Sequence, residues 1–159
     1  MYRERGYFEA TARQRVNRDG RAVDVTIELR EGPPTHLYRV LLKGTGSIFS
    51  PRVLGEMPDD IGLELDEVFD HRNYISAKYR FRELLREEGY AYARVEGEVR
   101  VDPELRKAVV QLNATPGPLV HLGRMQISGN GTISLRRIER KMSWDEGERY
   151  DPDALPLLR

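Results

Sequence analysis

The sequence contains no cysteine, only four lysines and no long hydrophobic run. Without cysteine the chain can form neither a disulfide nor a thiolate metal site. No stretch approaches the roughly 18 apolar residues that a membrane-spanning helix needs, and the first residues lack the apolar core of a signal peptide. If the parent protein is exported, we therefore expect this chain to be an internal piece of it.

Composition is that of an ordinary folded protein. The 159 residues suffice for one domain or two small ones. Hydrophobic residues make up 39% and charged residues 33%, which is typical of a polar surface over a modest core. The 26 basic and 26 acidic residues cancel. Because nucleic-acid-binding proteins usually carry a net basic surface, we expect no nucleic-acid partner.

The chain repeats itself. The run from His36 to Gly46 aligns with the run from His121 to Gly131, 85 residues later, and five of the eleven positions are identical. Two further pairs of short motifs keep nearly the same spacing: Gly32-Pro33 with Gly117-Pro118, and Arg5-Gly6-Tyr7 with Glu88-Gly89-Tyr90. A spacing preserved over most of the chain indicates tandem structural units.

One complete unit is predicted between residues 36 and 116. The run Leu37–Lys43 is short, apolar and followed by glycines, so it is predicted to be a strand. Two alternating runs near the end of the unit, Ala93–Val101 and Ala108–Ala114, are predicted to form a hairpin across a turn at Asp102-Pro103-Glu104.

Two helices are predicted between these strands. Ser50 is a good N-cap with proline after it, and opens a helix to about Met57. Asp70 is a second N-cap, and the helix that it opens ends before Gly89. Residues with helical spacing are predicted on one face of that second helix: Tyr74, Lys78, Phe81 and Leu85.

The rest of the chain is predicted to hold two partial units. Residues 1–32 are interpreted as the C-terminal half of an earlier unit, with a hairpin that turns at Asn17-Arg18-Asp19-Gly20. Residues 121–159 are interpreted as the N-terminal half of a later one, with a strand, a helix from about Ser134 and a second helix capped by Asp151-Pro152.

The order of elements in these units, and the glycine motifs that end their helices and strands, resemble those of the POTRA domains of the BamA/TamA family of outer-membrane assembly proteins. The resemblance implies an α+β fold of tandem β-α-α-β-β modules, each a three-stranded sheet packed under two helices, with one module complete and two partial. The motif residues of that family that match here are Gly6, Tyr7, Gly32, Pro33, Gly89, Tyr90, Gly117, Pro118, Gly129 and Asn130. Thr45 departs from the pattern, since asparagine is usual there.

Within this family, three residues of the second helix look more like TamA than BamA. They are His71, Tyr74 and Lys78, and no other residue supports this distinction.

The resemblance also implies a function. The parent would carry periplasmic modules before a C-terminal outer-membrane barrel, and its partners would be unfolded outer-membrane polypeptides and periplasmic accessory proteins. No catalytic residue, cofactor or metal comes with the family, so we expect no enzyme. Two alternatives are the POTRA region of a two-partner secretion transporter and a division-type interaction module; the tandem repeat argues against the latter.

The first strand of the hairpin is expected at a sheet edge, where unpaired N–H and C=O groups can take up another strand. The candidate partner-binding residues are Arg94, Val95, Glu96, Gly97, Glu98, Val99 and Arg100. An alternative interpretation is that these charges only protect the edge against aggregation.

Further expectations concern self-association and single residues. The half unit at 121–159 supplies elements that the half unit at 1–32 lacks, so two chains are hypothesised to complement each other. The pair Pro33-Pro34 predicts a stiff junction. His36 and His121 are expected to be structural, and Trp144 is expected to pack in a core.

Overall fold

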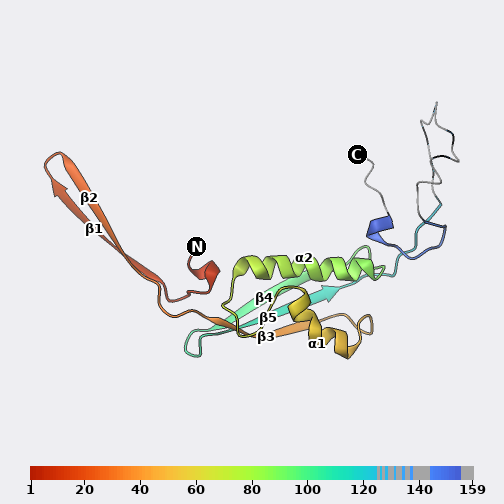
Figure 1. Ribbon diagram of the computed structural model, residues 1–159, viewed down its shortest axis with the longest axis horizontal. Helices are drawn as coiled ribbons and strands as arrows, with labels where there is room; N and C mark the ends of the chain where they lie inside the picture. The colour runs from red at the N-terminus through yellow and green to blue at the C-terminus, as the bar shows by residue number, and fades with distance from the viewer. Residues whose placement is uncertain are drawn as a thin grey trace.

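The computed structural model describes residues 1–124, 126, 128, 131, 134, 137 and 144–154 (Figure 1). Among these residues, no helix has the length and apolarity required to cross a membrane. The elements in chain order are η1 (Arg3–Arg5), β1 (Thr11–Asp19), β2 (Ala22–Arg30), β3 (His36–Lys43), α1 (Pro51–Asp60), α2 (His71–Glu87), β4 (Arg94–Asp102), β5 (Lys107–Thr115) and η2 (Pro152–Ala154).

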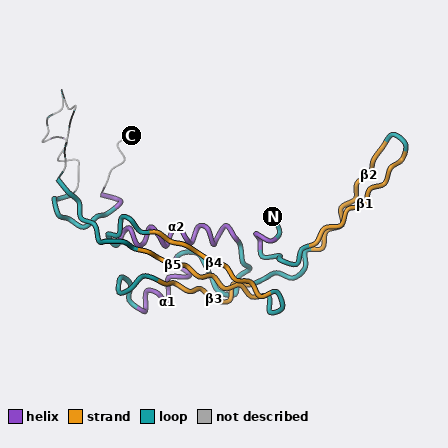
Figure 2. Tube along the Cα trace, turned by 180° about the vertical axis from the view of Figure 1, so that it is seen from behind, coloured by secondary structure: helices purple, strands orange, loops and turns teal. Residues whose placement is uncertain are grey.

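The central part of the chain forms a three-stranded sheet packed against two helices. The strand order is β3-β5-β4, with β3 parallel and β4 antiparallel to β5. Helix α2 runs along the length of this sheet (Figure 2). The predicted β-α-α-β-β order is therefore confirmed for the central unit.

Helix α1 begins as predicted but ends later. The Ser50 side chain accepts a hydrogen bond from the Val53 amide. The helix was expected to end near Met57, yet it continues to Asp60 with Pro58 inside it. A proline inside a helix removes its own N–H from the ladder and crowds the carbonyl four residues before it, but the burial of Met57 and Ile61 holds the last turn against the core.

Helix α2 begins at the predicted cap, since the Asp70 carboxylate accepts a hydrogen bond from the Arg72 amide at 2.7 Å. Three of the four residues predicted on one face of α2 are buried, namely Tyr74, Phe81 and Leu85. Ala77 takes the inward place, whereas Lys78 is half-buried with Nζ 5.7 Å from the centre of the Tyr74 ring. The residues of α2 that are buried are Tyr74, Ala77, Phe81 and Leu85.

The central strand supplies the sheet side of the core. Every second residue of β5 faces the helices and is buried, and these residues are Ala108, Val110, Leu112 and Ala114. They form one cluster with Met57 of α1 and with Phe81 and Leu85 of α2. This cluster is the hydrophobic core of the central unit.

Strands β1 and β2 form a separate two-stranded hairpin that extends away from the rest of the molecule (Figure 1). The predicted turn is displaced, because Asp19 still pairs with Ala22 and the loop consists of Gly20 and Arg21 alone. Gly20 has a φ of 52°, which suits the first central position of a tight hairpin turn.

Much of the last predicted half unit lies outside the described residues. This holds for Met125 and Ile127 of the strand expected after His121, for Gly129-Asn130 and for most of the helix expected from Ser134. The described residues of that expected strand carry one isolated bridge, between His121 and Arg149. Asp151 caps the short helix η2 as expected, since its carboxylate accepts a hydrogen bond from the Asp153 amide at 2.8 Å.

Candidate partner-binding edge

Strand β4 lies at one edge of the sheet, and among the described residues it pairs with β5 alone. Its side chains alternate between exposed and partly buried. All the exposed ones are charged: Arg94, Glu96, Glu98, Arg100 and Asp102. The strand order thus agrees with the edge position expected from the sequence, although the strand runs from Arg94 to Asp102 rather than from Ala93 to Val101.

The opposite edge is partly covered. The first residues of β3 pair with the segment that leads into α2, through a bridge between His36 and Val68. The Leu37 amide donates to the Glu67 carbonyl at 2.8 Å, and the Asp66 amide donates to the Leu37 carbonyl at 2.8 Å. The start of β3 is therefore less open to an added strand than β4 is.

Gly97 is required by the packing of α2 on β4. A Cβ on Gly97 would lie 2.5 Å from the Tyr74 hydroxyl and 3.0 Å from a Leu112 methyl group. Real Cβ atoms essentially never show a contact of 2.5 Å, and a contact of 3.0 Å is tighter than most. Gly97 was expected only as part of a partner-binding strand; its structural role is to leave room for Tyr74.

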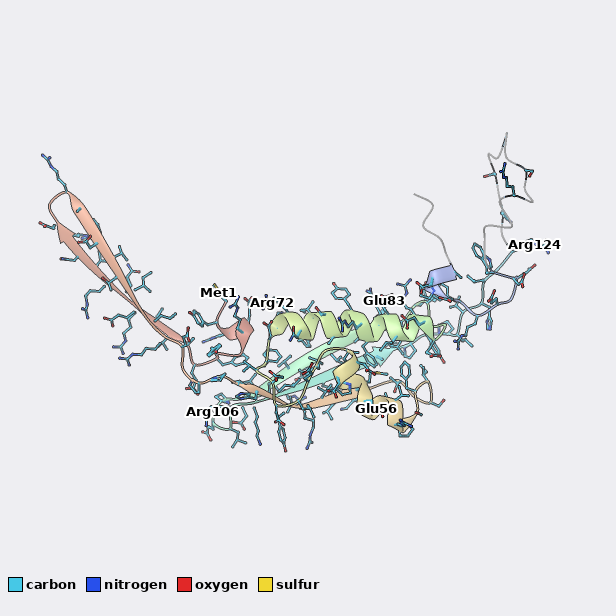
Figure 3. All side chains as sticks on the ribbon, in the orientation of Figure 1. Met1, Glu56, Arg72, Glu83, Arg106 and Arg124 are labelled. Atoms are coloured by element: carbon cyan, nitrogen blue, oxygen red, sulfur yellow. The ribbon has the colours of Figure 1, made fainter. Side chains whose placement is uncertain are left out.

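A groove runs between α2 and the edge strand. It is lined by Ile75, Lys78, Tyr79, Arg82 and Val95. The Arg82 guanidinium lies 5.2 Å from the centre of the exposed Tyr79 ring. It also forms an ion pair with Glu83, which is labelled on the upper side of α2 in Figure 3. A strand added to β4 would place alternate side chains in this groove.

The outward face of the edge strand carries an ion pair. The Arg100 guanidinium contacts both carboxylate oxygens of Glu98, at 2.9 and 3.1 Å. These hydrogen bonds from Arg100 lower the pKa of Glu98, with a smaller contribution from Lys43 across the sheet. Both side chains are exposed, so the pair contributes little to stability.

The family motif Gly-Tyr ends a helix at two places in the same way. After α2, the Gly89 amide donates to Arg86 and the Tyr90 amide donates to Leu85. After η1, the amides of Gly6 and Tyr7 make the equivalent bonds. Their acceptors are the carbonyls of Arg3 and Tyr2. Gly89 and Gly6 have φ values of 87° and 85°, the left-handed geometry of this helix-ending motif.

Each of these glycines anchors the segment that follows a hairpin. The Gly6 carbonyl accepts a hydrogen bond from the Thr35 amide at 2.8 Å, and the Gly89 carbonyl accepts one from the Val120 amide at 3.0 Å. The carbonyls of Thr35 and Val120 in turn accept the amides of Phe69 and Tyr150, both at 2.9 Å. The same backbone junction is therefore built twice.

The second junction also has side-chain contacts that sequence analysis missed. The Arg86 guanidinium donates to the Tyr150 hydroxyl at 2.7 Å, which together with a neighbouring Glu83 raises the pKa of Arg86. Arg149 forms an ion pair with Glu88 at 3.2 Å. The partners in each pair lie about sixty residues apart in sequence, so no local periodic pattern connects them.

The Gly-Pro motifs also lie at the junctions. Gly32 and Gly117 have φ values of 72° and 76°, which favour glycine. A Cβ on Gly32 would lie 3.1 Å from the Cβ of Glu9, a tight contact, and a Cβ on Gly117 would lie 3.6 Å from the Cβ of Tyr92, an ordinary one. Pro33 and Pro118 follow directly in the sequence.

The two histidines and the tryptophan considered in the sequence analysis make contacts that stabilise the fold. His121 forms a backbone bridge with Arg149, as His36 does with Val68. In the described part of the chain, no group of three or more His, Asp or Glu residues is arranged to hold a metal ion. Trp144 is only half-buried, and its indole N–H donates to the Gly123 carbonyl at 3.4 Å, so the expected core position is wrong.

Comparison with known proteins gives a likeness of structure. No protein-family model matches the chain. The crystal structure of Haemophilus influenzae BamA POTRA3-5 superposes with a TM-score of 0.64 at 20% identity, over 96% of this chain and 60% of that one. This chain therefore spans less than two thirds of that structure.

Two further solved structures match more loosely. Haemophilus influenzae BamA POTRA4 has a TM-score of 0.41 at 17% identity, over 54% of this chain and 93% of that one. The N-terminal domain of Omp85 from the thermophilic cyanobacterium Thermosynechococcus elongatus has a TM-score of 0.44 at 17% identity, over 94% and 62%. The sheet and helices described above, together with the first of these superpositions, show that the chain has the fold of POTRA modules.

Proposed function

We propose that this chain is the periplasmic, polypeptide-binding part of an outer-membrane assembly protein related to BamA, and that it binds extended segments by strand addition to β4. The observation that carries the proposal is an edge strand of nine residues that pairs on one side only among the described residues. Its partners would be unfolded outer-membrane polypeptides and periplasmic accessory proteins.

Strand addition suits such a task because backbone hydrogen bonds do not depend on the partner's sequence. The edge is nine residues long, about the length of one transmembrane barrel strand. Its outward charges, among them Glu98 and Arg100, oppose irreversible aggregation while leaving the backbone groups available. Protection and weak binding are therefore compatible functions of the same strand.

The proposal includes a division into modules. Residues 36–116 would be one complete module, residues 1–32 the C-terminal half of a preceding one, and residues 121–159 the N-terminal half of a following one. The support is the junction that recurs at Gly6 and Gly89 with the same backbone hydrogen bonds. A repeated junction favours a tandem array over a division-type protein with a single module. Nothing in the described geometry favours a two-partner secretion transporter.

Two finer expectations stay predictions. The lean toward TamA rests on His71, Tyr74 and Lys78, which lie together at the start of α2, with ring centres of His71 and Tyr74 5.6 Å apart. Self-association by half-module complementation involves residues 121–159, many of which lie outside the described residues. Light scattering over a range of concentrations tests it.

Site-specific cross-linking in the parent protein tests strand addition. This chain has no cysteine, so in a parent whose other cysteines, if any, are replaced by serine, a single introduced cysteine carries a photo-cross-linker at one site only. Glu98→Cys on β4 is the test site, and Gln111→Cys is the control, because Gln111 lies directly opposite Glu98 on the same face of the sheet but in the central strand.

We expect newly exported outer-membrane polypeptides to cross-link to the Glu98 site and much less to the Gln111 site. Equal cross-linking from both sites, or none from either, would contradict strand addition at β4. Fractionation of the parent tests its location independently: recovery in the outer-membrane fraction is expected, and recovery in the cytoplasm would contradict the proposal.

A further inference from the structure

Helix α2 has a second row of side chains beside the row that is buried in the core. Its members follow helical spacing and line the groove next to the edge strand: Ile75, Lys78, Tyr79 and Arg82. Only Ile75 of this row packs against the core. Because α2 lies along β4 (Figure 2) and Val95 of β4 lines the same groove, a strand added to β4 would run beside this row.

The row contains positive charge and no acidic residue. The Arg82 guanidinium is matched by the carboxylate of Glu83, 2.7 Å away. No ion pair in the described part of the chain includes Lys78. Its Nζ atom lies 5.7 Å from the centre of the Tyr74 ring, which stabilises a half-buried ammonium only weakly. Lys78 therefore carries the uncompensated charge of the groove.

An added strand changes the surroundings of this ammonium group. Alternate side chains of that strand point to the helix side of the sheet, and one of them lies beside Val95 and faces the groove. That side chain displaces water from Lys78, and a cation that loses water without gaining an anion destabilises the complex. An apolar side chain would leave the ammonium unpaired and a basic one would repel it, whereas a carboxylate replaces the water and matches the charge.

We propose that β4 selects extended segments with glutamate or aspartate at the position beside Val95, and that Lys78 binds this carboxylate. The inference rests on the strand addition proposed above and adds to it a chemical class of partner. Ile75 and Tyr79 line the groove with Lys78, so they offer apolar contact to the methylene groups of the same side chain.

The outward face of the edge strand gives no comparable preference. Its exposed charges have both signs, and two of them, Glu98 and Arg100, already form an ion pair with each other. Side chains that an added strand places on that face therefore meet charges of both signs in water, where single ion pairs contribute little. The selection by charge belongs to the groove side of β4.

Peptide binding to the 159-residue chain tests this selection. The parent peptide is about ten residues long and alternates leucine with threonine, as a barrel strand alternates apolar and polar residues. Glutamate or lysine then replaces each leucine in turn, so that the set covers every register that the peptide can adopt on β4. Dissociation constants are measured by fluorescence anisotropy of the labelled peptides.

We expect glutamate at one position of the peptide to give binding about tenfold tighter than lysine at that position. Lys78→Glu should reverse this order, because it reverses the charge of the groove. Lys78→Gln, which removes the charge with little change of shape, should bring the two peptides within about twofold of each other. Arg13→Glu in the exposed strand β1 is the control, since it changes the net charge equally but outside the groove, and it should keep the original order.

Two results would overturn the proposal and leave strand addition intact. One is a preference for glutamate that neither Lys78→Glu nor Lys78→Gln alters. The other is tighter binding of the all-leucine peptide than of every glutamate peptide, which would make the groove an apolar site. Failure of all the peptides to bind would instead contradict strand addition to β4 itself, so the two failures are distinguishable.

Discussion

The ring of Tyr74 in α2 lies against the backbone of Gly97 in β4, so closely that a Cβ on Gly97 would come within 2.5 Å of the hydroxyl and 2.9 Å of a ring carbon. This contact sets how near the long helix approaches the edge strand. Desolvation in this contact also raises the pKa of the Tyr74 hydroxyl. The groove beside the edge, with Ile75 on one side and Val95 on the other, therefore depends on a glycine.

Gly97→Ala should destabilise the central unit by about 1–3 kcal/mol, because the added methyl group overpacks the contact with Tyr74. Urea unfolding measures this change. The control is Gly55→Ala in α1, where a Cβ meets no atom within 4 Å and alanine should raise stability by up to about 1 kcal/mol.

A double mutant separates the contact from general strand effects. In a Tyr74→Ala background the further cost of Gly97→Ala should fall to a small part of its value, because no ring remains to collide with the methyl group and only the end of the Leu112 side chain lies near it. An undiminished cost in that background would show that Gly97 is required for another reason.

Tyr150→Phe should loosen the second junction. The substitution removes the 2.7 Å hydrogen bond from Arg86 and should make the backbone amides of Val120 and Tyr150 exchange roughly tenfold faster, because a hydrogen bond to a charged group contributes about 1.5–3 kcal/mol. Tyr92→Phe is the control, since Tyr92 is 70% exposed. Unchanged exchange in Tyr150→Phe would mean that the backbone hydrogen bonds alone hold the junction.

The cap of α2 should give a pH-dependent stability. Hydrogen bonding from Arg72 lowers the pKa of Asp70 below its ordinary value of 3.8, so the carboxylate stabilises the folded state above that value. This contribution is lost as pH falls through the folded-state pKa. Asp70→Ala should cost about 1 kcal/mol at neutral pH and progressively less at pH values below the ordinary pKa.

Ser50→Ala is the matched control for that titration, because Ser50 caps α1 without a titratable group. The loss of stability that Ser50→Ala causes, measured by urea unfolding, should be the same at neutral pH and below the ordinary pKa of Asp70. A cost of Asp70→Ala that does not fall on acidification would contradict the assigned role of the charge.

Hydrogen exchange should differ between the two hairpins in the isolated chain. The amides that join β4 to β5 should exchange near the rate of global unfolding, since this hairpin carries the core. Those that join β1 to β2 should exchange much faster, because an uncovered two-stranded hairpin is marginally stable in water. Equal protection in both hairpins would show that β1–β2 is held by something other than its own pairing.

Local signals in the sequence were sufficient for the elements of the central unit. The caps at Ser50 and Asp70 and the stop at Gly89 act through bonds to residues a few positions away, so they can be recognised in one segment. The end of α1 was misplaced because it depends on contacts that a local pattern does not show. Helix α1 was expected to end near Met57, and its continuation past Pro58 depends on the burial of Ile61, which is tertiary packing.

Only part of the candidate site could be predicted from the sequence. Alternation and element order indicated the edge position of β4, but not the reason for Gly97, because Tyr74 lies twenty-three residues away. Nor could sequence pattern find Arg86 with Tyr150, since each is a single residue whose partner is brought near by the junction.

Addition of a strand to β4 can be observed residue by residue through amide chemical-shift mapping. The isotope-labelled chain is titrated with a synthetic peptide of about ten residues that alternates apolar and polar side chains, the pattern of a barrel strand. We expect chemical-shift changes and slowed exchange at the amides of Arg94 to Asp102, with little change in β3. Changes confined to β3, to the helices or to the open face of β1–β2, with β4 unaltered, would contradict it.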